Sequence, residues 1–268
     1  MFKDDKLTKY YSFDNCFVRI NKTEIKIFKS KFKAIYQATP QNSFQHTFFY
    51  FKAPGIYEKF INHITGNDPD RKKILMEMIG YLSHDYLSEC NKIIIISDTI
   101  NPKNEFPPSR TGKSLIVKAI ETVLKSSFDF NTHAFLRLDA KFFKKYIFND
   151  NDHNGISLIH VDDVYSKFNL ENLFILLECH KFIITSNHPY TLQGISTTIR
   201  TKQFQIDNYY DHNITPVKEF KRFFFNGFTK RDWDCFFSFM IRCSKVFFDN
   251  SKPYLFDREN INYENQQV

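Results

Sequence analysis

The sequence predicts an α/β fold built on a parallel sheet and flanked by helices. Residues 92–98 are a continuous β-branched run, which is typical of a strand buried on both faces. The triplet Gly112-Lys113-Ser114 follows, and a helix-period pattern then begins. Strand, loop and helix therefore have the order of a phosphate-binding loop. Two later apolar runs also end in polar side chains, at Asp162-Asp163 and at Asn187.

Alternation and helical spacing predict the elements that precede this core. Residues 16–20 and 24–28 alternate like short strands. Apolar side chains recur at helical spacing through residues 56–64. Asp68-Pro69 predicts an N-cap followed by proline at the first helical position, and an apolar stripe continues from there to Leu82. We therefore expect a small helical subdomain to lead into the first core strand.

The core and the C-terminal part continue the same pattern. The segments expected after the phosphate loop are a helix at 116–124, apolar strands at 134–138, 157–161 and 182–186, a helix at 169–178, and a basic loop at 198–202. Thr215-Pro216 predicts the start of a helix that runs through Phe224. Thr229 and Asp232 resemble a capping box before an aromatic-rich helix. Those aromatic side chains indicate a core face rather than a platform for stacking bases.

The Gly-Lys-Ser triplet has the residue types that phosphate binding needs. Backbone N–H groups at a helix start are unpaired and lie at its positive end, so they bind phosphate oxygens. Gly112 allows close approach of the backbone, Lys113 reaches the outer phosphates, and the Ser114 hydroxyl holds Mg²⁺. The full pattern has a glycine five residues before Gly112, where Pro107 stands. The triplet also occurs by chance, so it gains weight only from the motifs downstream.

Those downstream motifs supply the remaining groups of a P-loop enzyme. In a P-loop enzyme the first of two such acids binds Mg²⁺, often through water, and the second polarises the attacking water. We therefore expect these roles for Asp162 and Asp163. Asn187, at the end of the next strand, is placed to orient water near the γ-phosphate. Arg200 is a candidate arginine finger across a subunit interface. The structural alternatives are an Asp-rich turn and a solvated basic loop, which are common in α/β proteins.

Composition sets limits on partners and location. The chain of 268 residues has 37 basic and 30 acidic side chains, a net charge of +7. This charge fits a nucleic-acid partner, and it also fits a solvated basic surface. The five cysteines are odd in number and widely spaced, which indicates reduced thiols and argues against zinc. With no apolar stretch near 18 residues, we expect a soluble cytoplasmic protein without a membrane partner.

Taken in this order and spacing, the motifs resemble a superfamily 3 helicase of the AAA+ class. The resemblance is closer to the helicase portion of primase-helicases from phages and mobile elements. It covers roughly residues 54 to 250, and its motifs are 111–114, 160–164, 184–188 and Arg200. It implies a P-loop AAA+-type parallel sheet flanked by helices, and a ring, usually a hexamer, that hydrolyses ATP with Mg²⁺. Such a ring translocates on single-stranded DNA in a bacterial or phage-infected cell, with a primase or replication initiator as a possible partner.

Two departures from that family leave a second function open. Ser109 and Arg110 stand where small glycine-type residues are usual before Thr111, so Arg110 either crowds the phosphates or holds them by charge. Such helicases usually place a DNA-gripping β-hairpin between the Asp-Asp strand and the Asn strand, and here only residues 164–181 intervene. The alternative is therefore a reduced or remnant helicase, which acts as a nucleotide-binding adaptor or loader without unwinding.

A third hypothesis, a small-molecule P-loop kinase, is disfavoured because a monomeric kinase needs no finger from a neighbouring subunit. The expected cofactor-binding residues are Ser109, Arg110, Thr111, Gly112, Lys113 and Ser114, the metal ligands Ser114 and Asp162, and the catalytic residues Asp163, Asn187 and Arg200. The predicted parts of the chain are an adaptor of mixed strands at 1–53, a helical subdomain at 54–91, a P-loop ATPase core at 92–210, C-terminal helices at 211–255 and a polar tail at 256–268.

Overall fold

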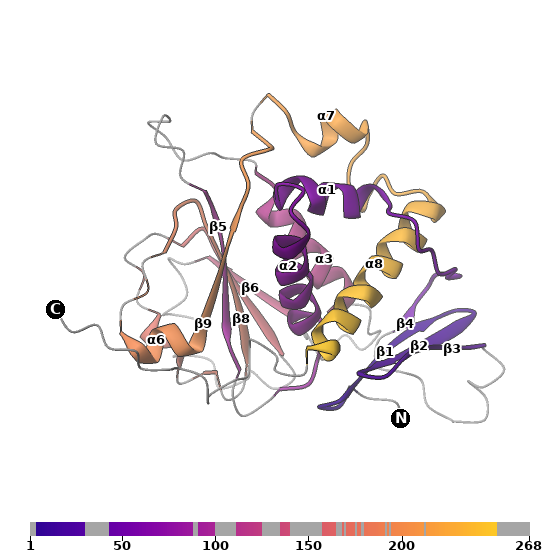
Figure 1. Cartoon of the computed structure of the whole chain (residues 1–268), viewed down its shortest axis with the longest axis horizontal. Helices are drawn as coiled ribbons and strands as arrows, with labels where there is room; N and C mark the ends of the chain where they lie inside the picture. The colour runs from indigo at the N-terminus through magenta and orange to yellow at the C-terminus, as the bar shows by residue number, and fades with distance from the viewer. Residues whose placement is uncertain are drawn as a thin grey trace.

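A computed structural model gives two sheets and a group of helices (Figure 1). The structure describes residues 4–29, 43–87, 91–99, 111–124, 135–139, 157–164, 168, 170–174, 176–177, 180–190, 192, 194–211 and 213–250. The predicted polar tail and the residues just before Thr111 lie outside this described part.

The larger sheet contains five described strands, all parallel, in the order β6-β7-β8-β5-β9. Their bounds are β5 Ile93–Asp98, β6 Phe135–Asp139, β7 Leu158–Asp162, β8 Lys181–Ser186 and β9 Thr201–Ile206. Parallel strands end at the same edge of a sheet, and ligands gather at that edge in open α/β sheets. The predicted polar motifs after β7 and β8 therefore share an edge with the segment that follows β5.

Strand β5 is buried on both faces, as its β-branched run predicts. Ile94 and Ile96 belong to a core cluster shared with the helices, whereas Ile93 and Ile95 belong to a second cluster on the opposite face of the sheet. All four side chains are fully buried. The predicted fold class, an α/β parallel sheet flanked by helices, is confirmed.

Four helices lie on the same side of this sheet and share a core cluster with strand β5 (Figure 1). They are α1 Ile56–Ile64, α2 Pro69–Leu82, α3 Lys113–Leu124 and α8 Lys230–Asp249. The predicted caps are present, because the Asp68 side chain accepts hydrogen bonds from the first turn of α2 and Thr229 forms a capping box with Asp232. The aromatic face of α8 packs into the core, as predicted.

The N-terminal region forms a separate four-stranded sheet in the order β3-β2-β1-β4. Its strands are β1 Thr8–Phe13, β2 Cys16–Asn21, β3 Ile25–Lys29 and β4 Ser43–Phe44. Strands β2 and β3 match the prediction, but β1 was not expected. Its polar residues conceal the strand pattern, since Lys9 and Ser12 are buried there beside Tyr11 and Phe13.

Two buried lysines close the C-terminal end of α2. Lys9 of β1 donates to the Ser83 carbonyl and pairs with Asp4 at 3.0 Å. Lys181, the first residue of β8, donates to the Tyr81 carbonyl at 3.0 Å and to the His84 carbonyl. Cations at this position satisfy carbonyl groups that have no partner within the helix. The helix end is therefore bound by both sheets.

Three predicted segments differ from the structure. The expected basic loop at 198–202 is wrong, because α6 Ile195–Arg200 runs directly into β9. The sequence of β9 has only two large apolar side chains, so pairing with β5 decides its conformation rather than its own pattern. Helix α7, Pro216–Phe220, ends at Lys221 in a left-handed conformation instead of reaching Phe224. In the predicted 169–178 helix, the structure describes α5 at Glu171–Phe174.

Two further expectations concern thiols and membranes. Among the described residues, Cys16, Cys235 and Cys243 are buried and form no disulfide, which agrees with reduced thiols. Within the described ranges, none of the helices has the length and apolar character that crossing a membrane requires.

Candidate nucleotide-binding site

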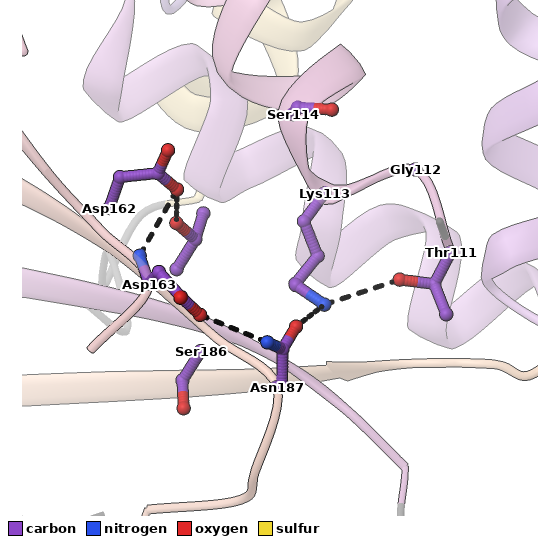
Figure 2. A pocket seen from close by; sticks show the side chains of 9 residues that line it. Thr111, Gly112, Lys113, Ser114, Asp162, Asp163, Ser186 and Asn187 are labelled. Atoms are coloured by element: carbon purple, nitrogen blue, oxygen red, sulfur yellow. Dashed lines mark hydrogen bonds between the residues drawn. The ribbon is translucent and has the colours of Figure 1, made fainter. Parts of the chain in front are cut away.

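A pocket opens at the carboxyl edge of the parallel sheet, where the predicted motifs meet (Figure 2). Its cavity volume is about 130 Å³, and the pocket is partly open to solvent. Its lining consists of Thr111, Gly112, Lys113, Ser114, Asp162, Asp163, Thr185, Ser186 and Asn187. The sequence predicted seven of these residues as site residues, and the fold brings all seven to one cavity.

The backbone of the phosphate loop has a conformation that requires glycine. Gly112 has a φ of +104°, and a Cβ added there would lie 2.6 Å from the Phe60 ring of α1. Helix α3 begins at the next residue, and Leu115 N already donates to the Gly112 carbonyl at 2.9 Å. The first N–H groups of this 12-residue helix therefore open at the pocket.

Lys113 contacts three oxygen atoms around the pocket. Its ammonium donates to Asn187 Oδ1 at 3.1 Å and to Thr111 Oγ1 at 3.3 Å, and it forms a close ion pair with Asp98. The side chain is only 11% exposed. Figure 2 shows Lys113 pointing toward Asn187, which comes from the end of β8. The lysine thus connects the phosphate loop with the two neighbouring strands β5 and β8.

Asp162 is oriented by a chain of hydrogen bonds within the sheet. Its Oδ1 accepts from the Thr185 hydroxyl at 2.6 Å and from Asp163 N at 3.1 Å. Since Thr185 donates its proton to Asp162, its oxygen accepts from His160 Nε2 at 3.0 Å. His160 is buried beneath the pocket. Bonds donated to a carboxylate favour its charged form, so Asp162 is suited to hold a cation.

Asp163 has a backbone conformation that is uncommon outside glycine. Its φ is +52°, and such a left-handed residue costs roughly 1–2 kcal/mol. The turn directs its carboxylate toward Asn187, whose Nδ2 donates to Asp163 Oδ1 at 2.9 Å (Figure 2). Strained residues of this kind gather at functional sites. The predicted pair of Asp163 and Asn187 is therefore in direct contact.

The sequence reasoning missed Asp98, the last residue of β5. Its side chain is fully buried and accepts a 2.5 Å hydrogen bond from the Thr111 hydroxyl. Burial raises the pKa of this carboxyl group, while the hydrogen bonds from Lys113 and Thr111 and the charges of Lys113 and His188 lower it. The signal was available, because Asp98 ends its strand just as Asp162 ends β7.

Arg200 lies at the opposite edge of the sheet. It ends α6 immediately before Thr201, which pairs with Ile93, the first residue of β5. Its guanidinium lies over the Phe174 ring at 4.9 Å from the centroid. Its expected role at a neighbouring subunit's site stays a prediction. Ser109 and Arg110 lie outside the described residues.

The residues present fit a magnesium-bound nucleoside triphosphate. A glycine cradle that a Cβ would fill, a helix N-terminus and Lys113 together suit phosphate oxygens. Mg²⁺ is usually bound by one or two carboxylates and by substrate phosphates. The Ser114 hydroxyl and the Asp162 carboxylate both line the same cavity and could supply such ligands. The lining therefore suits phosphate groups with a bound Mg²⁺, and the ATP itself stays a prediction.

Comparison with known proteins gives only distant structural similarity. No protein-family model and no curated protein sequence matches the chain. Similar solved structures include the A form apo structure of the NrS-1 C-terminal region, with a TM-score of 0.43 and 10% identity over 90% of this chain. Another apo structure of that region has a TM-score of 0.42 and 11% identity over 92% of this chain. The chain covers 66% and 67% of those two structures.

A further similar structure is that of C. elegans PCH-2, with a TM-score of 0.34 and 10% identity. It matches 68% of this chain and 58% of that one. At such identities and TM-scores the similarity carries no argument about chemistry. The functional inference therefore depends on the chain's own residues.

Proposed function

We propose that the chain is the ATP-hydrolysing core of a replicative-type DNA helicase, which acts on single-stranded DNA as a ring. The observation that carries this proposal is the convergence of the phosphate loop, the Asp162-Asp163 pair and Asn187 in one pocket. Each group comes from the end of a different parallel strand or from the helix N-terminus beside it. A strand followed by an unrelated Asp-rich turn would not require this convergence.

The geometry supports a separate chemical role for each of these residues. The α3 N-terminus and Lys113 would bind and orient the outer phosphates. Ser114 and Asp162 would hold Mg²⁺, which would supply positive charge to the phosphate oxygens. Asp163 accepts a proton from the attacking water, and Asn187 positions that water beside it. The 2.9 Å hydrogen bond between these two side chains supports their acting on the same water molecule.

The ring is proposed from the position of Arg200. An arginine finger stabilises charge as the phosphoryl group leaves, so it must reach the γ-phosphate. Arg200 lies at the amino-terminal edge of the sheet, whereas the pocket lies at the carboxyl edge. It can serve this chemistry only in the pocket of a second copy. A closed ring supplies one such finger to every pocket.

The decisive experiment is ATP turnover with and without single-stranded DNA, alongside a mass measurement of the assembly. We expect a DNA-stimulated ATPase that forms an oligomer. Lys113→Ala should abolish nucleotide binding, because it removes the charge facing the outer phosphates. The matched control is Lys118→Ala in the same helix, since Lys118 is half exposed and pairs with Glu121 three residues later. Equal activity of Lys113→Ala and Lys118→Ala would refute this site.

The second candidate is a nucleotide-binding adaptor or loader that has lost its motor. The short interval between β7 and β8 favours it, because only residues 163–180 separate two directly paired strands. This candidate predicts that the chain binds ATP but that single-stranded DNA does not stimulate ATP turnover. It also predicts strand separation that is slow or undetectable. For the helicase, DNA binding should weaken steeply with salt and show little sequence preference. Robust unwinding by this chain would exclude the adaptor.

A further inference from the structure

Asp98 is a buried acid that faces the phosphate loop. It ends β5, has no exposed surface, and lies between Thr111 and Lys113 of the loop. One carboxylate oxygen accepts from the Thr111 hydroxyl, and the other pairs with the Lys113 ammonium. A negative charge at this position is unexpected, because phosphates are also negatively charged. We therefore expect Asp98 to affect the binding of phosphate groups at this loop.

The bonds of Lys113 define what phosphate binding requires. A lysine ammonium has three N–H donors, and Lys113 directs them to Asp98, Thr111 and Asn187. A phosphate oxygen can receive a bond from Lys113 only when one of these acceptors releases it. Asp98 is the charged acceptor of the three, so it is the strongest competitor.

We infer that Asp98 is a positioning residue that holds Lys113 at the phosphate loop and sets nucleotide affinity by competing with phosphate for its ammonium. This inference depends on the proposed nucleotide-binding function. The competition has two parts. Lys113 must leave a buried carboxylate, which is costly because an uncompensated buried charge is unfavourable. The remaining carboxylate charge also repels phosphate oxygens at close range.

The environment of Asp98 supports this cost. In the described part of the chain, Asp98 interacts electrostatically with Lys113 on the loop and with His188 after β8, and it also accepts a hydrogen bond from Thr111. Burial already raises its pKa above the ordinary value while Lys113 is in place. Withdrawal of the lysine would remove its closest positive partner. Nucleotide binding therefore has to disrupt the ion pair of this carboxylate, so the Asp98 charge lowers the affinity for nucleotide.

The test is Asp98→Asn, which preserves shape and an acceptor for Thr111 while removing the charge. We expect the Kd for ATP, measured by calorimetry, to fall at least about tenfold, equivalent to about 1.4 kcal/mol. KM should fall with it, while kcat changes little. A purely structural role would instead weaken binding. The matched control is Asp234→Asn, since Asp234 is also buried and paired with a lysine, on α8; its Kd should equal that of the wild type.

The outcomes separate this inference from the proposed function. A wild-type chain that binds no nucleotide refutes the proposed function itself. If the wild-type chain binds ATP and Asp98→Asn binds it equally or more weakly, only the inference that Asp98 lowers nucleotide affinity is refuted. If Asp98→Asn does not fold, Asp98→Ser provides the test, because this smaller neutral side chain also removes the charge that pairs with Lys113. The Kd should again fall; an unchanged or higher Kd would overturn the inference.

Discussion

A side chain at position 112 should destabilise the protein in two ways, through backbone strain and through steric overlap with Phe60. The φ of +104° is one that L side chains rarely adopt, and this strain costs about 1–3 kcal/mol. The added Cβ of Gly112→Ala would also lie 2.6 Å and 2.8 Å from Cε2 and Cζ of Phe60. Relieving such overpacking costs typically about 1–3 kcal/mol. The sum predicts a loss of roughly 2–6 kcal/mol in the free energy of unfolding.

The Phe60 ring has little freedom to move aside. It is fully buried, its centroid lies 5.6 Å from that of Tyr210 and 5.5 Å from that of Phe224, and it packs on Tyr57 of its own helix. Displacement would disturb all three rings. The overlap should therefore weaken nucleotide binding as well as lower stability, because the added methyl group either displaces the phosphate loop or pushes α1 away from it.

Urea unfolding, followed by circular dichroism and by the fluorescence of the single tryptophan, Trp233, measures this loss. Gly194→Ala is a matched control, because Gly194 has a φ of +83° and, its chain neighbours aside, no described atom lies within 4 Å of an added Cβ. It carries the backbone strain without the clash. Gly112→Ala should thus be less stable than Gly194→Ala by about 1–3 kcal/mol. Equal losses in the two variants would refute the contact with Phe60.

Other predictions concern turnover, assembly and pH. Asp163→Asn should keep ATP binding but lose hydrolysis in a phosphate-release assay, because an amide cannot accept the proton; wild-type turnover would contradict this role. Arg200→Ala should keep binding and lower turnover by roughly 10³-fold, and mixing it with Lys113→Ala subunits should restore activity; a fully active monomeric Arg200→Ala would exclude the ring. Burial lowers the pKa of His84 from 6.5 to about 3, so the unfolded chain takes up this proton first. Stability should therefore fall as pH drops from 6.5 toward 3, by up to about 1.36 kcal/mol per unit, and urea unfolding should show a shallower fall for His84→Gln.

Much of the site could be predicted because its parts are local. A strand that ends in Asp162-Asp163, a strand that ends before Asn187 and a glycine at a helix start each depend on neighbouring residues, and parallel pairing then brings them together. Asp98 ends its strand as Asp162 does, but that position does not reveal its contacts with Thr111 and Lys113. The ion pair is a tertiary contact, and no spacing rule for phosphate loops includes it.

The missed strands have a related explanation. Strand β9 follows a helix without a turn signal, and its alternation is weak, so its pairing with β5 decides the outcome. In β1, Lys9 occupies a fully buried position that sequence rules assign to apolar residues. Its charge is balanced there by Asp4, five residues earlier, and by the Ser83 carbonyl, which is 74 residues away along the chain. A polar pattern was therefore a poor guide to the strand.

Lys9 and Lys181, the two lysines at the end of α2, also affect which truncated fragments of the chain can fold. A fragment starting at residue 54 would retain Lys181 but lose Lys9 and Asp4, so the Ser83 carbonyl and the His84 ring would lose the partners that β1 brings. The same cut would uncover the α8 side chains that pack on β1 and β4, such as Phe237. Truncation experiments that aim to isolate the catalytic region should therefore retain the first 53 residues, because without them a loss of activity would report misfolding rather than a missing function.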